Sequence, residues 1–377
     1  MGQPRRTFIG LSLAGCLTFG NVAGAATSST KTTTDFAEAS ANGDKATAAA
    51  IRKNANFECP AAAATAGKAM AGPRKAKLQV ITTVAPITSI IANVAGDRAN
   101  VRGVIPEGSD SHTFEPKPSA AKIFVTADVV FINGLSLEDP TKDLAKKNMP
   151  SSAQLVELGS IVLKPDQLIF DFSFPRDGGK PNPHLWTNPP MASCYATIAG
   201  SVMAKADPAN AAFYQANAKA LKAKIDDLGR RFKAASDTVK PQNRKLLTYH
   251  DAYAYFAAFY GWQIIGAIQV SNFEEPTPKE VAALIDQIKK EKVPAIFGSE
   301  VFPSPVLAQI GKEAGVKYVD TLRDDDLLGA PGDAGHSYLG LMKSDFITMV
   351  ASLDGDASGL KSFNATDVVK DRADYPQ

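Results

Sequence analysis

The chain carries one helical pattern as long as a whole domain. Between Asp207 and Val239 it has a single glycine and no proline beyond Pro208. Apolar residues recur there at helical spacing, at Tyr214, Ala218, Leu221, Ile225, Leu228 and Phe232. Asp207 suits an N-cap and Pro208 the first helical position, so a single helix of about 50 Å is predicted. A rod of this length joins two lobes more readily than it fits inside one.

Short apolar runs alternate with helical patterns on both sides of this helix. Strands are predicted at residues 78–83, 101–105, 127–132, 245–249, 263–270, 295–297 and 317–319. Helices are predicted between them, at residues 87–94, 252–260, 278–291 and 305–314. The sequence therefore predicts an α/β protein with parallel sheets in two lobes, 77–206 and 240–377, joined by a rigid linking helix at 207–239.

The first 25 residues predict an export signal. Arg5 and Arg6 precede a mostly apolar core at residues 8–19, which is too short to cross about 30 Å of hydrocarbon as a helix. Two endings remain open: residues 13–16 (LAGC) fit a lipobox that would place a lipid anchor on Cys16, and residues 23–25 (AGA) fit ordinary cleavage. The arginine pair also fits a twin-arginine signal. The protein is expected in the periplasm or at the cell surface.

Residues 26–76 are rich in alanine, threonine, serine and lysine, and they predict a flexible linker. Cys59 lies in this segment, so its pairing with Cys194 stays open. The 41 basic residues nearly balance the 39 acidic ones, which gives no support for a nucleic-acid partner.

Three of the four histidines lie where a short strand or turn gives way to a polar loop. These are His112, His184 and His250. A single histidine is more often a structural residue than a ligand, but the set is unusual in a chain with so few. Ligands bind at the carboxyl ends of parallel strands, so we expect the three to meet in the cleft between the lobes. The fourth, His336, is expected at the surface of the last loop.

Five ordered motifs resemble the cluster A-I (cluster 9) metal-binding proteins of ABC importers. They are residues 108–119 (GSDSHTFEPKPS), 133–138 (NGLSLE), 182–189 (NPHLWTNP), 250–256 (HDAYAYF) and 337–342 (SYLGLM). The resemblance implies two lobes with a long linking helix, a monomer, and delivery of a metal ion to an ABC permease and its ATPase. It also implies a fourth ligand, an aspartate. Counting back from Ser337 without gaps gives Asp326, with Asp325 as the alternative.

The ligand set His112, His184, His250 and Asp326 favours Zn²⁺, because imidazole suits zinc and manganese prefers more oxygen. Mn²⁺ remains the alternative, since residues 164–181 lack the histidine-rich loop of many zinc-binding members. Asn182 and Asn188 also replace the usual aspartates beside His184.

A zinc hydrolase is the rival function. Glu115 and Asp251 are the candidate bases, but four protein ligands leave no open position for water, and no HExxH motif is present. We therefore expect a binding protein that is not an enzyme.

Overall fold

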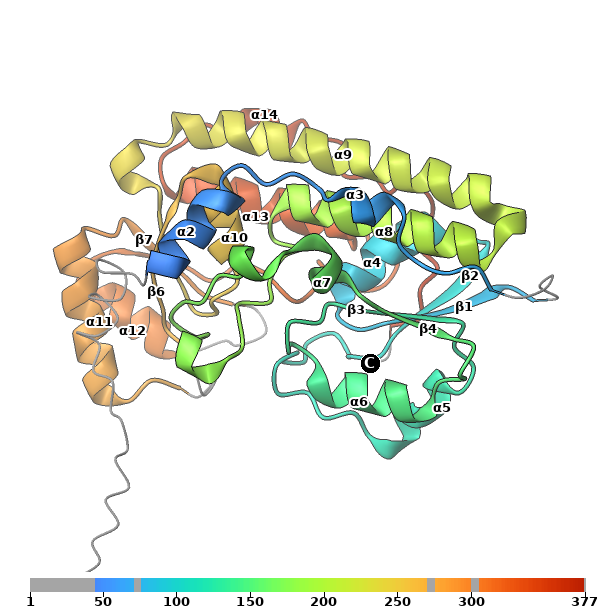
Figure 1. The fold of residues 1–377 in the computed structure, drawn as a ribbon. Helices are drawn as coiled ribbons and strands as arrows, with labels where there is room; N and C mark the ends of the chain where they lie inside the picture. The colour runs from blue at the N-terminus through green and yellow to red at the C-terminus, as the bar shows by residue number, and fades with distance from the viewer. Residues whose placement is uncertain (1–44, 71–75, 270–274, 300–304, 376–377) are drawn as a thin grey trace, which may run out of the picture.

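A computed structural model describes residues 45–70, 76–269, 275–299 and 305–375. It has two lobes, each built on a four-stranded parallel sheet, as predicted (Figure 1). The first sheet has the order β2-β1-β3-β4, with β1 at Leu78–Thr82, β2 at Ala99–Gly103, β3 at Val129–Ile132 and β4 at Gln154–Glu157. The second has the equivalent order β6-β5-β7-β8, with β5 at Lys245–Thr248, β6 at Gln263–Ala267, β7 at Ala295–Phe297 and β8 at Lys317–Val319.

Helices cover both faces of the first sheet. Its helices are α4 (Ala85–Ala95), α5 (Ala121–Phe124), α6 (Asp139–Asn148), α7 (Leu158–Val162) and α8 (Pro189–Ala206). Along β3, Val129 and Phe131 join the core under α4 and α8, whereas Val130 and Ile132 join the core under α5 and α6. Side chains of a strand alternate between faces, so a strand covered on both sides must be apolar throughout.

The second lobe is covered in the same way. Its helices are α10 (Ala254–Tyr260), α11 (Pro278–Glu291), α12 (Pro305–Ala314), α13 (Tyr338–Ser352) and α14 (Ser358–Lys361). The side chain of Thr277 accepts from the backbone N–H of Glu280, and Glu280 accepts from that of Thr277, which forms a capping box at the start of α11.

The linking helix is shorter than predicted. A 3₁₀ turn at Pro208–Asn210 precedes α9, which runs from Ala211 to Thr238. Asp207 does not cap the backbone; its carboxylate accepts from the side chains of Asn210 and Tyr214 instead. Figure 1 shows α9 running along one side of the molecule over α8 and α13. The helix therefore spans both lobes.

The segment expected as a flexible linker is folded over residues 45–70. It contains α2 (Lys45–Asn54), which packs on α10 and on the turn Pro165–Gln167, and α3 (Ala61–Ala64), which packs on α8. A disulfide joins Cys59 to Cys194 in α8, the pairing that the sequence left open. Ala50, Phe57 and Ala63 of the segment are buried against the lobes, whereas Ile51 is exposed. The composition of this segment did not predict that it is folded. The segment has no core of its own and is held instead by packing on the lobes and by one disulfide.

The end of the chain returns to the first lobe. The backbone of Asp374 accepts from Gly103 and donates to Val101 on strand β2. The edge of β2 offers unpaired backbone groups, which the tail satisfies. The predicted second lobe at 240–377 therefore includes a tail that packs elsewhere.

Within the described residues no helix has the length and apolar character needed to cross a membrane. The predicted export signal at residues 1–25, with both of its processing sites, lies outside the described residues.

Candidate metal centre

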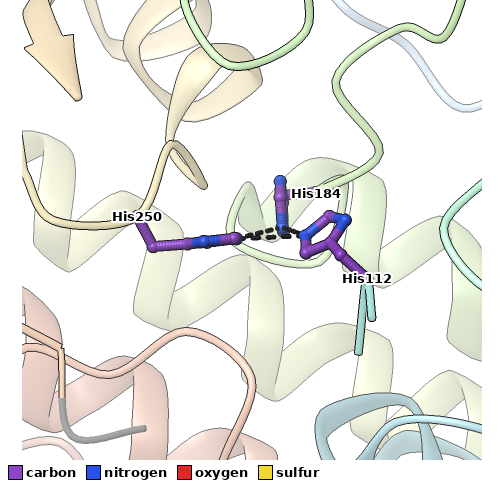
Figure 2. A group of neighbouring side chains, drawn as sticks. All are labelled: His112, His184 and His250. Carbon is purple, nitrogen blue, oxygen red and sulfur yellow. Dashed lines mark hydrogen bonds between the residues drawn. The ribbon is translucent and has the colours of Figure 1, made fainter. Parts of the chain in front are cut away.

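The three predicted histidines meet at one point between the lobes (Figure 2). His112 lies in the loop after β2, His184 lies just before α8, and His250 follows β5. The Nε2 atom of His112 is 3.1 Å from that of His184 and 3.1 Å from that of His250. The Nε2 atoms of His184 and His250 are 2.8 Å apart. Three imidazole nitrogens that converge in this way could hold one metal ion.

Amide oxygens orient two of these rings. The Nδ1 atom of His184 is 2.9 Å from Oδ1 of Asn182, and the Nδ1 atom of His250 is 2.9 Å from Oε1 of Gln269. An amide oxygen can only accept, so each Nδ1 carries the hydrogen and each Nε2 keeps its lone pair for a metal. Asn182 was recognised in the sequence as a replaced aspartate, whereas Gln269 was missed.

Aromatic rings pack against the histidines of the centre. The ring of Phe174 lies 5.4 Å from the ring of His112 and 5.6 Å from that of His184, and Trp186 packs edge-on against His184 at 5.1 Å. A cavity of about 250 Å³ opens beside His112 and is lined in part by Phe174 and Lys180. Since His184 and His250 are buried, this cavity offers an approach to the centre.

The predicted aspartate lies elsewhere. The Oδ2 atom of Asp326 accepts from the backbone N–H of Gly108 at 2.7 Å. Asp325, the alternative, accepts from the hydroxyl of Ser111 at 2.5 Å. Asp324 is the carboxylate next to the histidines: its Oδ2 is 3.7 Å from Nε2 of His250. Both of its oxygens are buried and have no hydrogen-bond partner in the part of the chain that the structure describes. Asp324, rather than Asp326, is therefore the member of the triplet that forms an ion-pair contact with a histidine of the group.

Three side chains hold the backbone of the Asp324 loop. The indole N–H of Trp186 donates to the carbonyl of Asp324 at 2.8 Å. The hydroxyl of Tyr253 donates to the carbonyl of Arg323 at 2.6 Å, and the buried carboxylate of Asp345 accepts from the N–H of Arg323 at 3.1 Å. These bonds hold the loop backbone in place and so limit the positions that the carboxylate of Asp324 can take.

The pKa values of the three histidines are shifted in different directions. Burial, followed by the charge of His250, holds the pKa values of His112 and His184 well below the usual 6.5. Burial also acts to lower the pKa of His250, but the carboxylates of Asp324 and Asp325 outweigh it and the pKa is raised. Burial raises the pKa of Asp324 as well. His112 and His184 are therefore neutral near pH 7 and can bind a metal ion. His250 and Asp324 compete for one proton.

The other predicted residues lie outside the histidine group. The carboxylate of Asp251 accepts from the N–H of Ser173 at 3.2 Å rather than from a ligand ring, and Glu115 is exposed. His336 is buried, contrary to prediction: its Nδ1 is 3.1 Å from the carbonyl of Leu328 and its ring packs edge-on against Tyr375.

A three-histidine centre between two α/β lobes fits a protein that binds a metal ion. Residues 80–352 match the model of the family described as "zinc-uptake complex component A periplasmic" (ZnuA), and the chain belongs to that family. The chain is therefore a metal-binding substrate-binding component of an ABC transporter, extracytoplasmic, with a permease and ATPase as partners. Members of this family bind a substrate for transport and do not catalyse a reaction.

Curated relatives carry names for different metals. The chain is 26% identical over 276 residues to "Manganese-binding lipoprotein MntA" of Halalkalibacterium halodurans, covering 73% of this chain and 88% of that one. It is 27% identical over 270 residues to "Iron ABC transporter substrate-binding lipoprotein MtsA" of Streptococcus pyogenes, covering 71% and 86%.

Solved structures share the fold. The zinc-binding protein TroA of Treponema pallidum matches with a TM-score of 0.65 at 22% identity, over 74% of this chain and 99% of that one. A manganese-bound periplasmic metal-binding protein of Candidatus Liberibacter asiaticus matches with a TM-score of 0.65 at 24% identity, over 74% and 100%.

Proposed function

We propose that the protein captures Zn²⁺ and delivers it to its permease, with His112, His184, His250 and Asp324 as the four ligands. The observation that supports this most is the meeting of three Nε2 atoms, with distances of 2.8 to 3.1 Å between them. Three imidazoles and one carboxylate form a tetrahedral set that suits zinc. A divalent cation at that point would also satisfy the two buried oxygens of Asp324, which have no hydrogen-bond partner among the described residues.

Mn²⁺ is the second candidate, because relatives of this chain are named for manganese. Manganese prefers a ligand set richer in oxygen than the one proposed here. Affinity also rises from manganese to zinc for a given set of nitrogen ligands. The nitrogen-rich centre therefore favours zinc.

The deciding experiment is elemental analysis of protein purified without added metal, followed by competition between zinc and manganese. We expect one zinc per chain and retention of zinc in excess manganese. Replacement of zinc by equimolar manganese would contradict the zinc assignment. His250→Ala is the matched test of the ligand set: it should lower zinc affinity by orders of magnitude while the fold is kept, as judged by circular dichroism.

The anchor and the assembly state belong to the same proposal. All three histidines come from one chain, so a monomer suffices for the centre. Relatives of the chain are named lipoproteins, which favours lipid attachment at Cys16 over cleavage after Ala25. Mass spectrometry of the mature N-terminus tests the anchor: an unmodified chain beginning at Ala26 would contradict it. Gel filtration with light scattering tests the monomer.

A further inference from the structure

The side chain of Asn182 is buried and its amide makes four hydrogen bonds. Its Oδ1 accepts from the backbone N–H of His184 at 3.1 Å and from the ring Nδ1 of His184 at 2.9 Å. Its Nδ2 donates to Oδ2 of Asp171 at 2.9 Å and to the carbonyl of Asp251 at 2.7 Å. An amide has two hydrogens to donate and two lone pairs to accept, so all of its capacity is used.

The surroundings permit only one direction of this amide. If it were reversed, its NH₂ group would face the backbone N–H of His184, and its oxygen would face the oxygens of Asp171 and Asp251. A carboxylate at position 182 would meet the same two oxygens with no hydrogen to offer, which is costly in a buried place. Asp171 and the Asp251 carbonyl together therefore favour an amide at this position.

The direction of the amide decides which nitrogen of His184 is free. With the Nδ1 hydrogen bonded to Asn182, the lone pair of the ring lies on Nε2, the atom that meets the other two histidines. The acceptor carries no charge, so the ring is held without adding a negative charge to the centre. Asp171 belongs to the same lobe as Asn182, whereas Asp251 follows the linking helix, so the bond to the Asp251 carbonyl forms only when the two lobes are together.

We propose that Asn182 is a positioning residue, which holds His184 in its metal-binding tautomer, and that Asp171 and the backbone of Asp251 hold Asn182. This inference rests on the proposed function, since it concerns a ligand of the same centre. Partners of metal-ligating histidines typically change metal affinity by about 10- to 100-fold when they are lost.

The test compares Asn182→Ala with Asn188→Ala. Asn188 lies in the same motif and is equally buried, but its amide has no hydrogen-bond partner among the described residues. We expect Asn182→Ala to weaken zinc binding by about 10- to 100-fold and Asn188→Ala to leave it unchanged. In metal-free protein, the ¹⁵N shifts of His184 should report the Nδ1–H tautomer in the wild type and in Asn188→Ala, and a mixture of tautomers in Asn182→Ala. A purely structural role would not move that tautomer.

A second pair of variants tests Asp171. Asn182→Asp keeps an acceptor for His184 but opposes Asp171, so zinc binding should weaken. Adding Asp171→Asn to that variant should restore part of the affinity, because an amide donor then faces the new carboxylate.

The outcomes separate this inference from the proposed function. If wild-type protein bound no zinc, the proposed function would fail. If the wild type bound zinc but Asn182→Ala matched Asn188→Ala in affinity, or showed an unchanged His184 tautomer, only the role of Asn182 would be overturned. Failure of Asp171→Asn to improve Asn182→Asp would overturn the role of Asp171.

Discussion

The carboxylate of Asp324 lies 3.7 Å from Nε2 of His250, inside the protein and without a hydrogen bond to either oxygen among the described residues. A buried carboxylate left in this state costs free energy unless a cation or a proton accompanies it. The neighbouring imidazole can hold the proton when no metal is present, and a metal ion would replace that proton. The pair is therefore the part of the centre where binding of the ion and release of a proton are linked.

Asp324→Ala should lower zinc affinity by orders of magnitude, because it removes the proposed fourth ligand. Asp326→Ala should lower it only slightly, since its carboxylate accepts from the backbone of Gly108. Competition with a fluorescent zinc chelator measures both. The reverse order of effects would return the ligand role to Asp326.

The pH dependence of zinc binding should reflect one proton near neutrality. The pKa of His250 is raised above 6.5, so lowering the pH begins to protonate this ligand above that value. The pKa values of His112 and His184 are well below 6.5, so these two rings stay neutral over the same range. Only a neutral imidazole binds the metal, and the affinity should fall by about ten-fold per pH unit as His250 and Asp324 take up their proton.

Zinc affinity measured from pH 8 to pH 5.5 against a chelator of known pH dependence checks this slope. A flat profile would exclude histidine ligation. A slope of about three just below pH 6.5 would mean that all three rings titrate together, against the separation of their pKa values.

Much of the fold and three of the site residues could be predicted from the sequence. The strands could be predicted because parallel strands buried on both faces are apolar throughout. The histidines could be predicted because they lie in recognisable motifs, after a strand or before a helix. The edge strand β4 was missed because only Val156 of its residues is fully buried. The pattern of a half-exposed strand is weak over four residues.

Which aspartate of the triplet lies next to the histidines could not be predicted, because the length of an irregular loop follows no periodicity. Asp324, Asp325 and Asp326 are chemically identical in the sequence, and only the fold separates them. Trp186 and Tyr253 hold the loop from positions far away along the chain, so that Asp324 lies next to His250. Gln269 was missed for a related reason: it follows β6, and its partner, His250, follows the neighbouring strand β5.

The Cys59–Cys194 disulfide should contribute to stability, since it closes a loop between residues 135 positions apart. Replacing both cysteines with serine should lower the free energy of unfolding by about 2–5 kcal/mol, as judged by reversible urea denaturation. The segment 45–70 should then become sensitive to proteases. Reducing agent should produce the same loss in the wild type and none in the double variant. Equal stability of the two proteins under oxidising conditions would contradict the prediction.

Phe174 should slow the exchange of metal with solvent. Its ring packs on the rings of His112 and His184 and lines the cavity beside His112, so it shields the centre from water. Phe174→Ala should speed zinc release by about ten-fold in stopped-flow chelation, because water can then reach and replace a ligand. Phe170→Ala is the matched control: Phe170 lies in the same loop, but its ring stacks under Arg176 at 4.3 Å, and its removal should leave the release rate unchanged. Equal release rates from the two variants would show that the ring of Phe174 does not control access to the centre.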